Sequence, residues 1–260
     1  MNKKEYKTFA DRIHWATLCR EWKEQWNESI PDSDNINIYS FIEKLNLSMT
    51  SDWYVVTDAG SAYYALSQNL KLLDKQKYIV SSSQADMGCA LPASIGVALS
   101  NPDKQVLCIT GDGSFNSNLQ ELAVIKYHNL PIKIFVLNNS GYLSIRNTQE
   151  KFFEGRVYGT SESKGLWFPS LAGIAKAYDI KWKRFTNIVD LNLPEIVNDS
   201  EACLIEVMCP FSQEIIPTQA LKDVDGKKVQ APLEDMYPFM ENSKFQNEKQ
   251  HALKGAPWEQ

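Results

Sequence analysis

The sequence predicts an α/β fold: a doubly wound, mostly parallel sheet with helices on both faces. Segments typical of strands alternate with segments typical of helices, and this order favours right-handed βαβ units. Three strand-like segments, VLCI, IKIFVL and CLIEV, are continuous apolar runs, as expected of strands buried on both faces. Of the 260 residues, 43% are hydrophobic and 23% are charged, which allows a sizeable core in one large domain or two small ones.

The two ends of the chain are expected to lie outside the α/β domain. Residues 1–34 predict a linker helix, because Phe9, Ile13 and Trp22 belong to an apolar pattern of near-helical spacing that ends in the turn residues SIPDSD. The first residues, MNKKEYKTFADR, lack the apolar region of a secretory signal, so we expect a cytoplasmic location. Residues 214–260 are polar and show no sustained period, which predicts a C-terminal tail across the domain surface with a loosely ordered end.

Residues 35–213 are expected to form the α/β domain. Apolar strand-like runs alternate here with helical segments, and Pro92 falls in the first turn of one helix, where proline is tolerated. We expect strands, with the turns that end them, at residues 53–60, 78–83, 105–113, 132–139, 180–185 and 203–209. We expect helices at residues 36–49, 61–70, 89–100, 118–129, 169–179 and 191–198.

Composition and charge disfavour several classes of function. The net charge is −5 without a long Lys/Arg cluster, so nucleic-acid binding has little support. No run of about 18 apolar residues occurs, so a membrane span is not expected. The five cysteines form no CxxC pair, and we expect buried, reduced thiols such as Cys108 and Cys203, not disulfides, a cysteine-bound metal or an iron–sulfur site. His14, His128 and His251 are too scattered to favour a Ser–His–Asp or zinc–histidine enzyme.

Unusual residues follow three of the predicted strands. They form the turns Asp58-Ala59-Gly60-Ser61, Gly111-Asp112-Gly113-Ser114 and Asn138-Asn139-Ser140-Gly141. Ligands of doubly wound sheets bind beyond the carboxyl ends of the strands, so these turns converge on one site if their strands are neighbours. Gly113 and Ser114 precede one predicted helix, and Gly60 and Ser61 begin another. Amides at such positions favour an anion.

Asp112 puts a negative charge where these amides favour an anion, so we expect a cation between the carboxylate and a phosphate. Mg²⁺ takes oxygen ligands in octahedral geometry and is often shared between protein and phosphates. The amide oxygen of Asn139 and the main-chain carbonyl of Gly141 are suitable further ligands, and two diphosphate oxygens and a water would complete the shell. A GDG turn or an Asn pair alone is usually only a turn, but the two together favour a site.

The stretch GDGSFNSNLQELAVIKYHNLPIKIFVLNN resembles the thiamine-diphosphate motif, in which GDG is followed by Asn-Asn beyond a helix and a strand. Its surroundings are similar to the acetolactate synthase group of that superfamily: MGCALPASIGVALSNP resembles the family's MGxxLPAAIGA helix, and VVTDAGSAYY resembles its TDxG turn. The resemblance covers residues 36–210 and implies the thiamine-diphosphate-binding fold. PLEDMYPF, near residue 232, is similar to the tails of acetolactate-synthase-like proteins from surface-sugar pathways.

The resemblance also assigns roles to residues of this sequence. It implies that Asp112, Asn139 and the Gly141 carbonyl hold Mg²⁺. Met87 would support the bent cofactor, although an ordinary core methionine is the alternative, and the Ala85 carbonyl would accept from the aminopyrimidine. The implied contacts of the diphosphate and its surroundings are Gly111, Gly113 and Ser114 on one side, Ala59, Gly60 and Ser61 on the other, and Tyr142 and Leu143 as flanking residues.

The catalytic glutamate of the family acts at N1′ of the aminopyrimidine and lies on a separate pyrimidine-binding domain, and a central domain carries FAD in some members. This sequence resembles neither domain, and its N-terminal helix is similar to the linker that leads out of the central domain. The resemblance therefore implies no catalytic residue in this chain. It implies a hetero-oligomer in which a partner subunit supplies the glutamate and any FAD. An isolated or inactive fragment is the alternative.

The expected activity is that of a decarboxylase or carboligase, hence a lyase or transferase, that acts on a 2-oxo acid such as pyruvate. Ala62 stands where acetolactate synthases usually carry His, and a simple decarboxylase subunit of the sulfopyruvate or phosphonopyruvate type is the near alternative. The scattered cysteines disfavour the β subunit of a ferredoxin-linked oxidoreductase. A non-catalytic binding subunit would not need both Asp112 and Asn139, and a nucleotide-binding Rossmann domain would show GxGxxG where TDAGSAYY stands.

Overall fold

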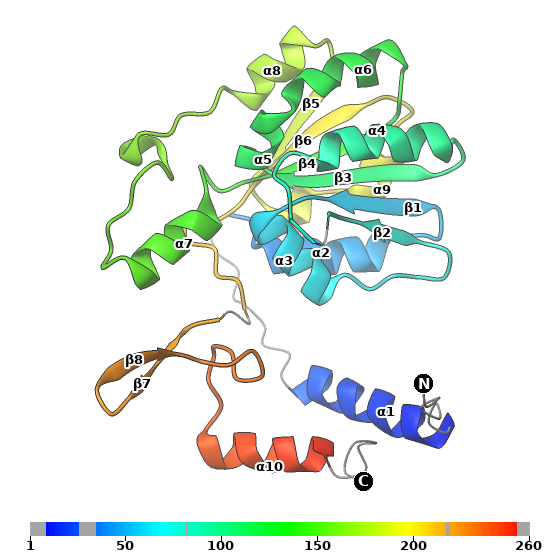
Figure 1. Ribbon diagram of the computed structural model, residues 1–260. Helices are drawn as coiled ribbons and strands as arrows, with labels where there is room; N and C mark the ends of the chain where they lie inside the picture. Colours follow the sequence, from blue (N-terminus) through cyan, green and yellow to red (C-terminus); the bar gives the residue numbers. More distant parts are fainter. Residues whose placement is uncertain (1–8, 26–34, 82, 217–218, 254–260) are drawn as a thin grey trace, which may run out of the picture. The chain divides into compact units, whose positions relative to one another are not determined.

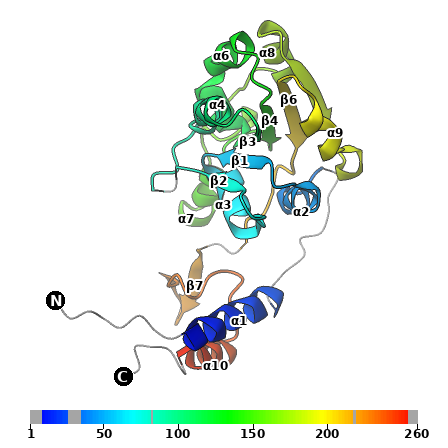
Figure 2. The same ribbon diagram turned by 90° about the vertical axis from the view of Figure 1, so that its right-hand side faces the viewer.

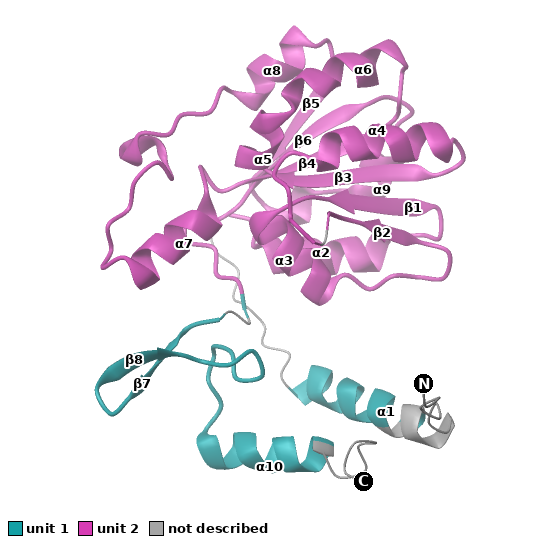
Figure 3. Cartoon of the chain, in the orientation of Figure 1, with its two compact units in different colours: residues 1–29, 216–260 teal, residues 30–215 magenta. Residues whose placement is uncertain are grey.

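The chain divides into two compact units (Figure 3). A computed structural model describes residues 9–25, 35–81, 83–216 and 219–253. The larger unit is Ile30–Ile215, and the smaller one combines Met1–Ser29 with Ile216–Gln260. Each unit is described by itself below.

The centre of the larger unit is a six-stranded sheet (Figure 1). Its strands are β1 (Trp53–Thr57), β2 (Lys77–Ile79), β3 (Gln105–Gly111), β4 (Lys133–Asn138), β5 (Lys181–Phe185) and β6 (Cys203–Met208). The order is β2-β1-β3-β4-β6-β5 and every neighbouring pair is parallel, which confirms the predicted doubly wound fold. The direction of winding reverses between β1 and β3, and this reversal is the switch point of the sheet.

Helices cover both faces of the sheet, as Figures 1 and 2 show. One face carries α2 (Ile38–Ser48), α3 (Gly60–Asn69) and α9 (Leu193–Asn198), and the other carries α4 (Ala90–Ser100), α5 (Asp112–Ser117), α6 (Leu122–Tyr127) and α8 (Leu171–Ala177). Within β3, Leu107 and Ile109 pack into the first core, and Val106 and Cys108 pack into the second. Because both faces are buried, the strand sequences are continuously apolar.

Two helical segments differ from the sequence prediction. The helix expected at residues 118–129 is observed as the 3-10 turn η1 (Leu119–Glu121) followed by α6, and Asn118, whose backbone is non-helical with φ −139° and ψ 29°, separates these elements from α5. Helix α7 (Leu143–Phe152) has no counterpart in the prediction, since most of its residues are polar and it buries only Leu143 and Arg146. The remaining short turns are η2 (Glu162–Lys164) and η3 (Ile188–Asp190).

The cysteines are free thiols, and Cys108, Cys203 and Cys209 are buried, which confirms the expectation for the first two. Burial raises the pKa of Cys108 to about 12, so this thiol stays protonated and inert at neutral pH. None of the helices in the described part of the chain combines the length and apolar character that a membrane span requires.

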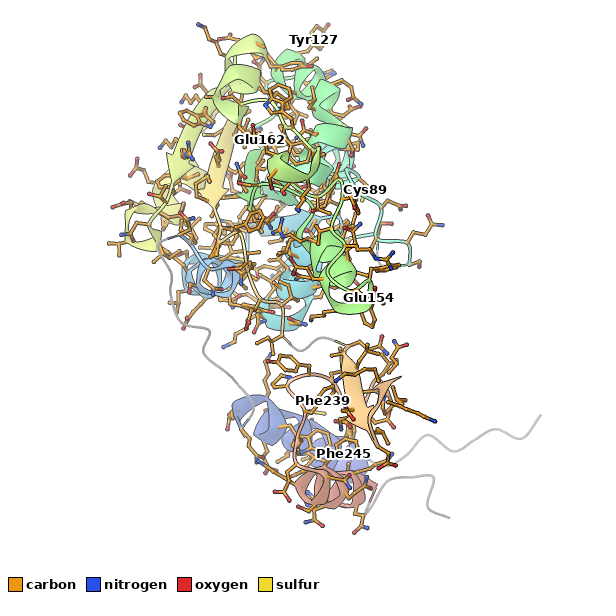
Figure 4. All side chains as sticks on the ribbon, turned by 90° about the vertical axis from the view of Figure 1, so that its left-hand side faces the viewer. Cys89, Tyr127, Glu154, Glu162, Phe239 and Phe245 are labelled. Atoms are coloured by element: carbon orange, nitrogen blue, oxygen red, sulfur yellow. The ribbon has the colours of Figure 1, made fainter. Side chains whose placement is uncertain are left out.

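The smaller unit is built from both ends of the chain. It contains α1 (Phe9–Gln25), the antiparallel hairpin of β7 (Leu221–Val224) and β8 (Lys227–Gln230), and α10 (Asn242–Leu253). The indole N–H of Trp22 in α1 donates to Glu248 of α10 (2.9 Å). Lys222 forms an ion pair with Asp235 and lies 4.7 Å from the centre of the Phe239 ring, which Figure 4 labels. The bond from Trp22 joins the two terminal segments, and the contacts of Lys222 hold the hairpin to the chain before α10.

Within residues 214–260, for which the sequence predicts a C-terminal tail, the structure contains the β7–β8 hairpin and α10. Asp225 and Gly226 connect β7 to β8 with positive φ angles of 52° and 77°, and Asp-Gly is a typical turn of tight hairpins. The strands, LKDV and KKVQ, are short and mostly polar, so they show no apolar alternation. The linker helix expected within residues 1–34 is α1, and the rest of that segment lies outside the described residues.

A buried lysine stabilises the turn that leads into β6. Lys133, at the start of β4, is fully buried, and its ammonium group donates to the main-chain carbonyls of Asp199 (2.6 Å) and Glu201. Burial lowers the pKa of Lys133 to about 8. The two carbonyls belong to the connection between α9 and β6, so one side chain satisfies acceptors that this turn leaves open.

Replacing Lys133 with Met should lower the free energy of unfolding by about 1–3 kcal/mol, because two carbonyls lose their donor while the side-chain volume is nearly kept. Chemical denaturation of the full chain measures the change. Lys71→Met is the control, since Lys71 is exposed and its replacement should change the free energy of unfolding by less than about 0.5 kcal/mol. Equal effects of the two substitutions would contradict the role given to Lys133.

Candidate functional site

Three turns meet at the carboxyl edge of the sheet. They follow β1, β3 and β4, which are adjacent strands: Thr57 pairs with Ile109, and Gly111 pairs with Leu137. The condition that the sequence prediction set, that the three strands are neighbours, is therefore met. The winding also reverses here, between β1 and β3, and ligands of doubly wound sheets bind at such a switch point.

Asp112 joins two of these turns. It is the first residue of α5, and its side chain is buried. One carboxylate oxygen accepts from the N–H of Gly113 (2.8 Å), and the other accepts from the N–H of Gly141 (2.9 Å), in the turn after β4. Burial raises the pKa of Asp112 to about 6, although the N–H groups of Gly141 and Gly113 lower it. A carboxylate in this environment is an anion that a nearby cation would stabilise.

Asn139 carries a buried acceptor without a partner. Its side chain is 3% exposed, and its Oδ1 accepts no hydrogen bond from the described residues. A buried acceptor left unpaired costs about 1–3 kcal/mol. A cation beside Oδ1 would remove this cost, so the surroundings of Asn139 fit those of a metal ligand.

The donor set fits Mg²⁺. It combines the Asp112 carboxylate, the Asn139 amide oxygen and the main-chain carbonyl of Gly141, and all three are hard oxygen ligands. The Gly141 carbonyl accepts from the N–H of Leu143 (3.1 Å) and keeps a second lone pair. Within the described residues, no cluster of three or more His, Cys, Asp and Glu side chains is arranged to hold a metal ion.

Close packing explains two of the glycines in these turns. A Cβ on Gly113 would stand 2.2 Å from the ring of Tyr142. A Cβ on Gly141, which has φ +140°, would stand 1.9 Å from the carbonyl oxygen of Thr160. That same oxygen accepts from the N–H of Tyr142 (3.0 Å). The turns after β3 and β4 are therefore pressed together with no space for side chains at either glycine.

Asp58 fastens the turn after β1, a role that the sequence analysis did not assign. Its fully buried carboxylate accepts from the N–H of Ala59 (2.7 Å), the hydroxyl of Thr110 (2.8 Å) and the N–H of Gly88 (3.1 Å). Burial raises its pKa, although the same hydrogen bonds lower it. Asp58 thus links the ends of β1 and β3 to the turn before α4. The only signal in the sequence was a carboxylate directly after an apolar strand.

Helix α3 begins at the turn after β1 and directs its first amides to the edge of the sheet. Gly60 has φ +63°, and Ala59 provides no side-chain cap, so no side chain of the N-cap satisfies the first-turn N–H groups. Ser144, in the first turn of α7, lies 3.5 Å from the place of a Cβ on Gly60. The predicted diphosphate contacts Ser61 and Ser114 are both buried at this edge.

The residues predicted to support the organic part of the cofactor lie on the turn before α4. Ala85 has φ 52° and donates its N–H to the Ser81 carbonyl (2.7 Å), and the side chain of Asn118 donates to the Gly88 carbonyl (2.9 Å). Met87 is 41% exposed, which rules out the alternative of an ordinary core methionine. Cys89, labelled in Figure 4, directly follows this turn.

An exposed apolar surface lies beside the turn after β4. Helix α7 and the segment after it expose Ile145 (44%), Phe153 (51%) and Tyr158 (74%), and these side chains line a pocket of about 520 Å³. Glu154, labelled in Figure 4, follows α7 in this region. We call Ile145, Phe153 and Tyr158 the α7 surface. Apolar patches of this kind often mark contacts with other protein domains.

The fold and the site define a class of protein: an α/β domain with a candidate site for a phosphate-bearing ligand at its switch point. The family described as "Thiamine pyrophosphate enzyme, C-terminal TPP binding domain" matches residues 58–207, which include every predicted cofactor-binding position. The chain belongs to this family, and thiamine diphosphate is the cofactor for which the domain is named.

Similar proteins agree with this assignment. The chain is 32% identical over 220 residues to the acetolactate synthase large subunit of Cyanidium caldarium, covering 84% of this chain and 36% of that protein. It is 28% identical over 209 residues to the acetolactate synthase isozyme 1 large subunit of Escherichia coli K12, covering 79% and 37%. The chain therefore spans about a third of the length of these relatives.

A solved structure shares the fold. The thiamine diphosphate-dependent 4-hydroxybenzoylformate decarboxylase of Rhodococcus jostii RHA1 matches with a TM-score of 0.64 and 22% sequence identity. The match covers 72% of this chain and 35% of that one. It supports the architecture of the sheet and its helices.

Replacing Gly141 with Ala should lower the free energy of unfolding by at least about 2 kcal/mol, because the added Cβ would strike the Thr160 carbonyl, which is backbone. Denaturant unfolding of the full chain measures this. Gly96→Ala in α4 is the matched control, since a Cβ there meets open space and should stabilise the helix by about 0.5–1 kcal/mol. A Gly141→Ala protein as stable as the control would show that the turns are not closely packed.

Proposed function

We propose that this chain is the diphosphate-binding subunit of a split, thiamine diphosphate-dependent enzyme of the acetolactate synthase type. It would decarboxylate a 2-oxo acid such as pyruvate and join the product to an acceptor. The observation that carries the proposal is that Asp112 and Asn139 directly follow two adjacent strands, β3 and β4, and that the side-chain oxygen of Asn139 is buried and unpartnered. Similarity to acetolactate synthase large subunits supports the reaction class.

Three groups of this chain would hold Mg²⁺: the Asp112 carboxylate, the Asn139 amide oxygen and the Gly141 carbonyl. The ion would stabilise the ionised form of Asp112 and give Asn139 the partner it lacks. Amides of the two glycine turns would meet the diphosphate, as first-turn amides of helices commonly do. The residues proposed for this contact are Ala59, Gly60 and Ser61 of the β1 turn and Gly111, Gly113 and Ser114 of the β3 turn.

When bound, thiamine diphosphate supplies the electron sink for decarboxylation of a 2-oxo acid. The exposed Met87 would support its bent form, and the Ala85 carbonyl would accept from its aminopyrimidine. Tyr142, whose ring lies against Gly113, and the buried Leu143 would form the wall beside it.

We infer that a second, cytoplasmic subunit completes the site. The chain spans about a third of the length of its relatives, and the catalytic glutamate is expected on a pyrimidine-binding domain that this sequence does not resemble. The α7 surface and Met87 are exposed apolar groups near the candidate site, and a partner would cover them. FAD, where the complex holds it, would be bound by the partner.

A decarboxylase subunit that releases an aldehyde, of the sulfopyruvate or phosphonopyruvate type, is the second candidate. Ala62 stands where acetolactate synthases usually carry His, and it is fully buried in the core, so it presents no polar group to a substrate. A non-catalytic subunit that binds no cofactor is less well supported, because it would have no use for the unpartnered oxygen of Asn139.

The chain purified alone should release no CO₂ from pyruvate, because only the partner supplies the glutamate. The complex formed by co-expression with a subunit that carries a pyrimidine-binding domain should release CO₂. Manometric or coupled assays measure CO₂, and analysis of the product separates acetolactate-type ligation from simple release of aldehyde. Activity of the chain alone would refute the split site. Absence of thiamine diphosphate binding by the complex would refute the cofactor.

Asp112→Ala and Asn139→Ala should each weaken Mg²⁺-dependent binding of thiamine diphosphate by at least about tenfold, since each removes a metal ligand. Calorimetric titration of the complex at several Mg²⁺ concentrations measures this. Asp103→Ala, at an exposed turn, is the control and should bind as the unmodified protein does. Unchanged Mg²⁺ dependence in either site variant would refute the metal assignment.

A further inference from the structure

The two asparagines at the end of β4 have opposite hydrogen-bond states. The Oδ1 of Asn139 has no partner among the described residues. Both ends of the Asn138 amide are engaged: Nδ2 donates to Glu206 Oε1 (2.7 Å), and Oδ1 accepts from the N–H of Ser140 (3.0 Å). The first asparagine is therefore bound to the protein, whereas the second is left for a ligand.

The register of the sheet places Glu206 where Asn138 can reach it. Val136 pairs with Glu206 on the parallel strand β6, and Asn138 lies two residues further along the same face of β4. Glu206 is 7% exposed, so its contact with Asn138 is largely shielded from water. The main chain is held at the same place, because the N–H of Cys209 donates to the Asn138 carbonyl (2.8 Å).

The turn that follows is bent and needs this support. Ser140 has φ 62°, in the left-handed region that non-glycine residues rarely adopt, and Gly141 has φ +140°. The bond from the Ser140 N–H to the Asn138 side chain is an Asx turn, which stabilises such a bend. The next N–H, that of Gly141, is bound by Asp112 (2.9 Å). Asn139 lies inside the Asx turn, between Asn138 and Ser140.

We propose that Glu206 and Asn138 are positioning residues, which hold the turn 138–141 so that Asn139 and the Gly141 carbonyl are presented to the metal ion. This inference rests on the proposed function. Glu206 orients the Asn138 amide by accepting from Nδ2, which turns Oδ1 toward Ser140. The amide then fixes the backbone on both sides of Asn139.

The negative charge of Glu206 is matched within the sheet. Arg184 of β5 pairs directly with Glu206, and its Nε lies 3.8 Å from Glu206 Oε2. Glu206 also lines a pocket of about 340 Å³ together with Asp112, Ser140 and Trp182. With one carboxylate oxygen on Asn138 and the other facing Arg184, Glu206 is kept in place as a support beside the candidate metal site.

A reversal of donor and acceptor tests the pair. Asn138→Asp replaces the donor to Glu206 with a second carboxylate, which Glu206 repels. It should raise the Mg²⁺ concentration for half-maximal thiamine diphosphate binding by about tenfold or more. Glu206→Gln keeps an acceptor for Asn138 and should stay within about threefold of the unmodified protein. When the two substitutions are combined, the new amide at position 206 donates to the new carboxylate at position 138, which still accepts from the N–H of Ser140. The Mg²⁺ requirement of this double variant should therefore recover to within about threefold. The measurements use the complex with its partner.

Two further measurements separate positioning from general stability. Amide hydrogen exchange at Ser140 and Gly141 in the chain itself should accelerate in Asn138→Asp and slow again in the double variant. Lys133→Met, which destabilises the same sheet away from this turn, should leave the Mg²⁺ requirement unchanged. Equal Mg²⁺ requirements for the unmodified protein and Asn138→Asp, or failure of the double variant to recover, would overturn the inference. Failure of the unmodified complex to bind thiamine diphosphate would overturn the proposed function, and amide exchange would still decide whether Glu206 and Asn138 hold the turn.

Discussion

The arrangement of the candidate site depends on the carboxylate of Asp112, which accepts from the N–H groups of Gly113 and Gly141 at once. These donors belong to turns that follow different strands, so one side chain fixes the distance between them. Such an anchor requires strands in parallel register, and it requires glycine at both positions, because a Cβ at either would strike Tyr142 or Thr160. The parallel register, the two glycines and the buried Asp112 carboxylate are thus all needed to hold the two turns at this distance.

Buried polar groups elsewhere in the larger unit are mostly satisfied. Asp58 accepts three hydrogen bonds, and Lys133 donates to two carbonyls. In the described residues, five buried side-chain atoms lack partners, and three of them belong to Asn139, Arg146 and Thr160. Asn139 is in the turn after β4, Arg146 is on α7, and Thr160 packs on Gly141. Three of the five unsatisfied groups therefore lie where a cofactor and a partner are proposed to bind, which is the pattern expected of a site that another molecule completes.

Much of this could be predicted from the sequence, and the reasons for the rest are physical. Strands buried on both faces, such as IKIFVL, are apolar throughout, and their turns carry Asp112 and Asn139, so both the fold and the convergence of the turns were accessible. Helix α7 was not, because most of its residues are polar and it buries only Leu143 and Arg146. The β7–β8 hairpin was not, because its strands are polar and brief. The role of Glu206 was hidden inside the apolar run CLIEV, since its partner depends on a register that a single strand does not reveal.

The proposed positioning role of Glu206 and Asn138 accounts for the unpaired side-chain oxygen of Asn139. An amide oxygen left without a donor inside a protein tends to turn toward any available N–H, and the N–H of Ser140 is one residue away from Asn139. Asn138 already occupies that N–H (3.0 Å), and Asp112 occupies the next one, on Gly141 (2.9 Å). With both N–H groups taken, the Oδ1 of Asn139 accepts no hydrogen bond from the described residues. Asn138 thus takes the N–H of Ser140, which would otherwise compete for the Asn139 oxygen. The Asn139 oxygen stays buried and unpaired, and this state favours a metal ion.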